Sequence, residues 1–159
     1  MIFSELVLDL QEQLKKDLAQ IRFLLKKNPA TGYARIVEVG KEVGKRYNIK
    51  LIVNFPKAGK IEEFDMYGKR DLSLIIDYDR KRFPIDREII KQKAKEILGE
   101  IKTEDAYMYE NKEGVRVFTK DWKIDILPHS VHIWTEFDNK VTMFCDWLME
   151  NAYQMKKIE

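Results

Sequence analysis

The chain of 159 residues weighs 19.0 kDa, which corresponds to one domain of ordinary size. Hydrophobic residues make up 45% of it, enough to form a core, so the composition excludes wholesale disorder. Charged residues reach 35%, above the usual share of roughly 25%, and this is typical of the Lys- and Glu-rich surfaces of heat-tolerant proteins. The 29 basic and 27 acidic side chains leave a net charge of +2, which excludes a strongly cationic nucleic-acid binder but allows a local basic patch.

Cysteine content and hydropathy indicate the compartment. Cys145 is the single cysteine of the sequence, so a disulfide within the chain is excluded and a reducing setting is favoured. No apolar run approaches the roughly 18 residues that a membrane helix needs. The first residues also lack the pattern of a signal peptide. We therefore expect a cytoplasmic protein that has no membrane partner.

Two helices are predicted at the start of the chain. Apolar residues three and four positions apart predict a long amphipathic helix over 4–27, with Ser4 as its N-cap. A break containing proline and glycine separates it from a second predicted helix over 33–46. Gly40 and Gly44 lie four positions apart in that helix, which favours close packing against a neighbouring element.

Strands and a third helix follow. Alternating apolar residues predict strands over 49–55 and 71–77, with a polar loop over 57–70 between them. A helical pattern over 85–98 ends at Gly99, which we expect to be its C-cap.

The last third of the chain predicts short strands and a closing helix. The strands are expected over 106–109, 115–118, 122–127 and 131–135, with a hairpin turn over 111–114. The helix is expected over 140–157. Because strand–helix–strand alternation is combined with hairpins, we expect one α+β domain over 1–159, with a mixed β-sheet packed by helices.

Carboxylates occur in two of the apolar strands. Alternation along 71–77 places Asp71, Ser73 and Asp77 on one face of the sheet. Asp125 lies alone among apolar neighbours, where burial of a carboxylate is costly unless a cation compensates it. Two strands that bring one carboxylate each to the same face would form a site for Mg²⁺, and metal–phosphate chemistry would follow.

This arrangement resembles the nucleotidyltransferase superfamily that includes DNA polymerase beta and the CCA-adding enzymes. In that family a Gly-Ser turn precedes an Asp-x-Asp strand by about a dozen residues, and a later strand carries a third carboxylate. Here Gly59 stands twelve residues before Asp71, and residues 124–128 resemble the third-carboxylate strand. The resemblance covers roughly residues 33–128.

The resemblance implies a nucleotidyltransferase-like topology for 33–128, with the N-terminal helix of 1–28 and the C-terminal helix of 140–157 added to it. It implies that Asp71 and Asp125 are catalytic and bind Mg²⁺. It also implies that a nucleoside triphosphate is bound by Lys57, Gly59, Lys60 and Ser73. The reaction would be attack of an acceptor hydroxyl, from a nucleic acid or a protein, on the α-phosphate, with pyrophosphate leaving.

Two residues depart from the family pattern. Lys60 stands where the family has serine, and Ser73 stands where it has its second metal-binding aspartate. A two-metal mechanism that needs three carboxylates would then lack a ligand. The alternative is a catalytically inactive member of the fold that acts as a binding or assembly module for a protein or nucleic-acid partner.

Structural explanations exist for the same residues. Asp71 could pair with Arg70 or Lys69, and Asp125 with Lys123 on the same strand face. Cys145 fits a small buried hydrophobe. The loop lysines fit a solvated loop, and the histidines of His129-Ser130-Val131-His132 fit structural or surface side chains. The tryptophans Trp122, Trp134 and Trp147 fit core or edge packing, with stacking on bases as the alternative, since aromatic residues flanked by lysine or arginine are used by single-strand binders.

Overall fold

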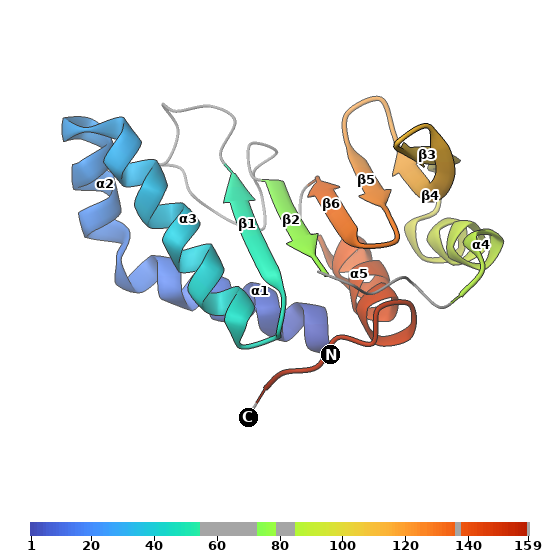
Figure 1. Cartoon of the computed structure of the whole chain (residues 1–159), viewed down its shortest axis with the longest axis horizontal. Coiled ribbons are helices and arrows are strands. Elements are labelled where there is room, and N and C mark those ends of the chain that lie inside the picture. The colour runs from blue at the N-terminus through green and yellow to red at the C-terminus, as the bar shows by residue number, and fades with distance from the viewer. Residues whose placement is uncertain (55–72, 79–84, 136–137, 159) are drawn as a thin grey trace.

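The computed structural model describes residues 1–54, 73–78, 85–135 and 138–158. These residues form one small α+β domain that contains a six-stranded sheet and five helices (Figure 1). The helices are α1 (Ile2–Lys16), α2 (Leu18–Lys27), α3 (Pro29–Lys45), α4 (Arg87–Leu98) and α5 (Asn139–Asn151). The strands are β1 (Lys50–Asn54), β2 (Ser73–Asp77), β3 (Lys102–Met108), β4 (Asn111–Phe118), β5 (Lys123–Ile126) and β6 (Ser130–Trp134).

The sheet order is β1-β2-β6-β5-β4-β3, and every pairing in the described part of the chain is antiparallel. The expectation of a mixed sheet is therefore wrong. After β2 the chain passes through α4 to β3 at the far edge of the sheet, instead of returning beside β2. It then comes back strand by strand until β6 pairs with β2. Strands that are adjacent in both sequence and sheet, as β3 to β6 are, can be joined by short hairpins and pair antiparallel, and the β2–β6 pair is antiparallel as well.

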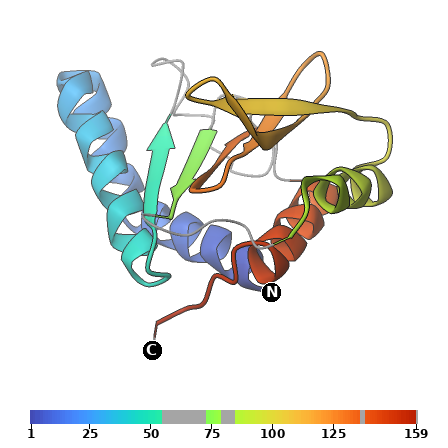
Figure 2. The ribbon, with the colours of Figure 1, turned by 45° about the vertical axis from the view of Figure 1, so that its right-hand side comes forward.

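One face of the sheet carries the core. Alternate residues of the strands, such as Leu51 on β1, Leu74 on β2 and Val131 on β6, are fully buried. They belong to the same apolar cluster as Phe3 of α1 and Phe144 of α5. Figure 2 shows α1, α4 and α5 on one side of the sheet, with α3 beside β1. The opposite face of the sheet is thus the one that the described helices leave uncovered.

The N-terminal helix differs from its prediction at both ends. It begins at Ile2, so Ser4 lies inside the first turn and the expectation of Ser4 as the N-cap is wrong. The Ser4 backbone N–H donates to Asp146 Oδ1 at 2.9 Å, and its hydroxyl donates to Oδ2 at 2.6 Å. The buried Asp146 carboxylate of α5 therefore accepts hydrogen bonds from the first turn of α1, as a capping side chain would, although it belongs to another helix. At Asp17 the predicted single helix divides into α1 and α2.

Gly40 and Gly44 of α3 pack closely against a neighbouring element, as predicted, and that element is β1. A Cβ added at Gly44 would meet the Ile49 carbonyl oxygen and Leu51 Cβ, both at 2.9 Å. At Gly40 the nearest atom would be Val53 Cγ2, at 3.0 Å. Glycine at both positions lets the helix approach the strand more closely than a side chain would allow.

The hairpin between β3 and β4 turns earlier than expected. Its turn is at Tyr109 and Glu110, which both have positive φ, so the predicted turn over 111–114 is wrong. Two successive positive φ values are typical of a type I′ turn, which usually contains asparagine or glycine.

The closing helix ends at Asn151, earlier than predicted. The residues after it pack on the domain without forming a helix, and Tyr153 and Met155 are buried.

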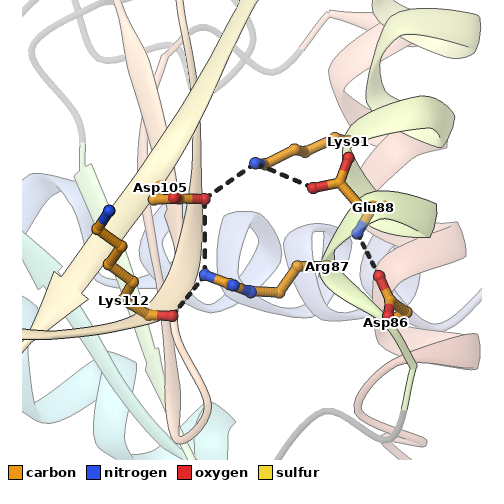
Figure 3. A network of polar contacts seen from close by, with 6 residues as sticks. All are labelled: Asp86, Arg87, Glu88, Lys91, Asp105 and Lys112. Atoms are coloured by element: carbon orange, nitrogen blue, oxygen red, sulfur yellow. Dashed lines mark hydrogen bonds and ion pairs between the residues drawn. The ribbon is translucent and has the colours of Figure 1, made fainter.

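A polar network fixes α4 to the β3–β4 hairpin (Figure 3). The Asp86 side chain caps the helix by accepting from the Glu88 backbone N–H at 2.7 Å. Lys91 Nζ lies 2.9 Å from Asp105 Oδ1 on β3, and the Arg87 guanidinium reaches the same oxygen at 3.5 Å. The hydrogen bond from Lys91 lowers the pKa of the Asp105 carboxyl. Gly99 ends the helix with φ of 78°, which confirms it as the C-cap residue.

Candidate functional site

Most of the residues implied by the nucleotidyltransferase resemblance lie outside the described residues. These are Asp71 and the proposed triphosphate contacts Lys57, Gly59 and Lys60. Ser73 begins β2, where its backbone pairs with Asn54 of β1. Asp125 is therefore the residue of that set whose side-chain environment is described.

Asp125 lies on the sheet face that the described helices leave uncovered, and a guanidinium contacts both of its oxygens. Arg116 Nε donates to Oδ1 at 2.7 Å, and Arg116 Nη2 donates to Oδ2 at 3.3 Å. Lys123 Nζ, the partner expected from the sequence, lies 3.9 Å from Oδ2. The side chain is 15% exposed, and its main compensation is Arg116, which stands directly opposite on β4. The hydrogen bond to Asp125 in turn raises the pKa of Arg116.

A continuous row of paired residues crosses this face and takes one residue from each strand. From β1 to β3 the row is Ile52, Ile75, His132, Asp125, Arg116 and Glu104. Its first two members are apolar, and its last three are charged with alternating sign. In the described part of the chain, no group of three or more His, Cys, Asp or Glu side chains is arranged to hold a metal ion.

His132 separates the apolar and charged halves of this row. It stands opposite Asp125 on β5, and its Nε2 lies 3.2 Å from the Ser130 hydroxyl oxygen. Burial lowers the pKa of His132, although the negative charges of Asp125 and Asp77 act in the opposite direction. Burial therefore favours the neutral form of the imidazole, which sits next to the Arg116–Asp125 pair.

A hollow of about 390 Å³ opens on the same face, beside the turn from β4 to β5. We call it the aromatic hollow, and its lining residues are Glu104, Arg116, Phe118, Thr119, Lys120, Asp121, Trp122, Lys123 and Trp134. The turn is closed by the Thr119 N–H, which donates to the Trp122 carbonyl at 2.9 Å. The volume lies within the range of roughly 300–1,000 Å³ that is usual for small-ligand sites.

Trp134 is the most exposed aromatic side chain of the hollow, with 46% of its surface accessible. It ends β6 and pairs with Lys123 of β5, whose Nζ lies 5.2 Å from the centre of the indole ring. This distance is that of a cation–π contact. The hollow thus offers a broad ring face and nearby positive charge at the surface of the sheet.

The sequence indicates packing or stacking roles for the tryptophans, but its local patterns do not show which of them lie together. Trp122 and Trp134 are brought to one hollow by the β5–β6 pairing, and Arg116 and Glu104 by the pairings of β4. These registers follow from the tertiary fold. The available signal was that four charged and two aromatic residues lie close together over 116–123.

No protein-family model, no curated protein and no solved structure matches the chain. The resemblance to nucleotidyltransferases therefore stays a prediction, and function is inferred from the geometry of the sheet face. None of the described helices combines the length and the apolar character that crossing a bilayer requires.

Proposed function

We propose that the chain binds single-stranded nucleic acid on the uncovered face of its sheet, with the aromatic hollow as a base-binding site. The observation that carries the proposal is Trp134, an exposed indole on a sheet surface with Lys123 over its ring. Tryptophan is highly buried on average, and this exposed indole differs from other exposed aromatic side chains of the domain in that it lines a hollow together with cations. Stacking of bases on aromatic rings next to lysine is how single strands are bound without strict sequence preference.

The charges of the hollow favour a phosphodiester over a triphosphate. Three cations and two carboxylates line it. Arg116 is engaged by Asp125 and Glu104. The cations best placed to meet a ligand are therefore Lys120, which is exposed, and Lys123, whose contact with Asp125 is longer, at 3.9 Å. Glu104 and Asp121 would repel a highly charged triphosphate. A phosphodiester carries a single negative charge and suits this modest positive balance better.

Magnesium-dependent nucleotidyl transfer, implied by the family resemblance, is the competing proposal. It needs the Asp125 carboxylate to bind Mg²⁺, whereas both oxygens of this group accept hydrogen bonds from Arg116. Metal binding would have to break a charge-assisted, two-point contact. We favour the nucleic-acid binding function for this reason.

The test is fluorescence anisotropy with labelled eight-nucleotide RNA and DNA at low salt. Trp134→Ala is expected to weaken binding by about fivefold to 150-fold, because stacking of one base contributes about 1–3 kcal/mol. Phe23→Ala is the matched control. Phe23 is an exposed aromatic on α2 that also has a lysine, Lys27, over its ring. It lies outside the hollow, so this variant is expected to bind as the natural chain does.

Two results would count against the proposal: no binding of either oligonucleotide, or equal weakening by the two variants. Binding should also decline as salt is raised, since phosphate contacts release counterions. The same assay should include nucleoside triphosphates with and without Mg²⁺. Magnesium-dependent triphosphate binding that is lost in Asp125→Asn, but kept in Trp134→Ala, would favour the transferase instead.

A further inference from the structure

A second hollow adjoins the aromatic hollow. It has a volume of about 500 Å³ and is lined by Glu100, Ile101, Lys102, Phe118, Thr119 and Lys120. Three of these residues, Phe118, Thr119 and Lys120, also line the aromatic hollow. The two hollows therefore adjoin at these three residues, which form a shared wall.

Cross-strand pairing explains how the two hollows are related. Lys102 of β3 pairs with Phe118 of β4, and Phe118 pairs with Lys123 of β5. Lys123 then pairs with Trp134 of β6. The result is a row of four adjacent positions in which cations and aromatic rings alternate across the sheet.

The spacing of this row sets the size of the ligand. Neighbouring strands lie about 4.8 Å apart, so two strand spacings separate Phe118 from Trp134 by roughly 10 Å. One base cannot stack on both rings over that distance, but two successive bases can occupy one ring each. The lysine between the rings, Lys123, and the residue of the shared wall, Lys120, lie where the linkage between those bases would run.

We infer that the site takes two successive nucleotides, with one base on Trp134, the next on Phe118, and the joining phosphodiester at Lys120 and Lys123. This inference rests on the proposed function and specifies the repeating unit that the face recognises. Lys102, at the end of the row on the edge strand, would meet the phosphate that follows the second base.

The experiment compares a mononucleotide with the corresponding dinucleotide, in ribose and deoxyribose forms, by isothermal titration calorimetry. For the natural chain the dinucleotide is expected to bind at least tenfold more tightly than the mononucleotide, because it adds one stacked base. Phe118→Leu keeps an apolar side chain but removes the ring. It should abolish most of the dinucleotide advantage while it changes mononucleotide affinity by less than about twofold. Trp134→Ala should weaken the binding of both ligands.

Two lysine-to-glutamine variants, one in the row and one outside it, test whether the lysine at the end of the row contacts the ligand. Lys102→Gln is expected to weaken binding of a trinucleotide severalfold, whereas Lys95→Gln, an equal charge change at an exposed position of α4, should not. Circular dichroism melting confirms that each variant is folded.

The outcomes separate the inference from the proposed function. If mononucleotide binding depends on Trp134 and the dinucleotide binds no more tightly, the two-nucleotide site is overturned and the proposed function stands. The inference also fails if Phe118→Leu weakens mononucleotide and dinucleotide equally. If neither ligand nor a longer oligonucleotide binds, both proposals fail. A preference between the ribose and deoxyribose forms identifies RNA or DNA as the partner.

Discussion

Asp146 shows how much one buried side chain contributes to this fold. It lies on α5, is 4% exposed, and accepts both the backbone N–H and the hydroxyl of Ser4. Its role is that of a helix cap supplied by another helix. A serine near the start of an apolar helix is an ordinary N-cap signal, so the sequence favours Ser4 itself as the cap. The real acceptor is 142 positions away, and local patterns carry no information about it.

We predict that Asp146→Ala lowers the free energy of unfolding by about 1–3 kcal/mol, because two partly buried donors of Ser4 lose their acceptor. Urea denaturation followed by circular dichroism measures this. Glu150→Ala is the control, since Glu150 lies one turn further along α5 and makes a long, exposed contact of 3.4 Å with the Ile2 N–H. Equal losses in the two variants would show that Asp146 has no special part in capping α1.

At the scale of elements, the sequence predicts which segments with alternating apolar residues are strands, but it does not predict which strands pair with one another in the sheet. The patterns around β1, β2 and β5 predict strands because burial on one face imposes a period of two. The β3–β4 turn is missed because Tyr109 and Glu110 adopt positive φ without glycine or asparagine. The same limit applies to the site. Asp125 was expected to be compensated by a cation, but Arg116 is identified only by the β4–β5 register.

The packing of α3 on β1 gives a second prediction. Alanine is favoured over glycine in a helix by roughly 1 kcal/mol, so Gly44→Ala should stabilise α3 if the helix stood alone. Against β1, the new methyl group meets the Ile49 carbonyl and Leu51 at 2.9 Å. We expect a net loss of about 1–2 kcal/mol, because overpacking typically costs about 1–3 kcal/mol.

Gly40→Ala is the graded comparison for Gly44→Ala. Its nearest contact is a valine methyl group at 3.0 Å, which can move more easily than backbone. Thermal denaturation should therefore show a smaller loss for Gly40→Ala than for Gly44→Ala. A gain of stability at Gly44 would mean that α3 and β1 are not in close contact.

At the scale of the whole molecule, the end of the chain connects several elements. Lys157 Nζ lies 3.1 Å from Asp9 Oδ2 on α1, and the Tyr47 hydroxyl donates to the same oxygen at 2.6 Å. Tyr153 stacks on Tyr78, which follows β2, with 4.6 Å between ring centres. The segment that was predicted to be the end of a helix instead links α1, the end of α3 and the sheet.

The pH dependence of stability is a property of the whole domain to which His132 contributes. Burial holds its folded pKa below the ordinary histidine value of about 6.5, so the unfolded state binds more protons between the two values. The contribution of His132 to the free energy of unfolding is therefore fully present above pH 6.5. It is lost as the pH falls through the pKa that His132 has in the folded state.

Melting temperatures between pH 7.5 and pH 5 test this sign. The natural chain should lose stability on acidification, and His132→Gln should lose less over the same interval. His129→Gln serves as the control, because it removes the other histidine of the chain. If His132→Gln leaves the slope unchanged, the imidazole is not held neutral by the sheet.

The antiparallel order of the sheet has a consequence for how the chain folds. Strands β3 to β6 pair with their neighbours in sequence, so their contacts are local and close short loops. The β2–β6 pairing instead joins residues near 75 to residues near 131. Closing so long a loop costs chain entropy before any contact repays it, and non-local pairing slows folding. We expect the β3–β6 meander to form early and the β2–β6 pairing to set the folding rate.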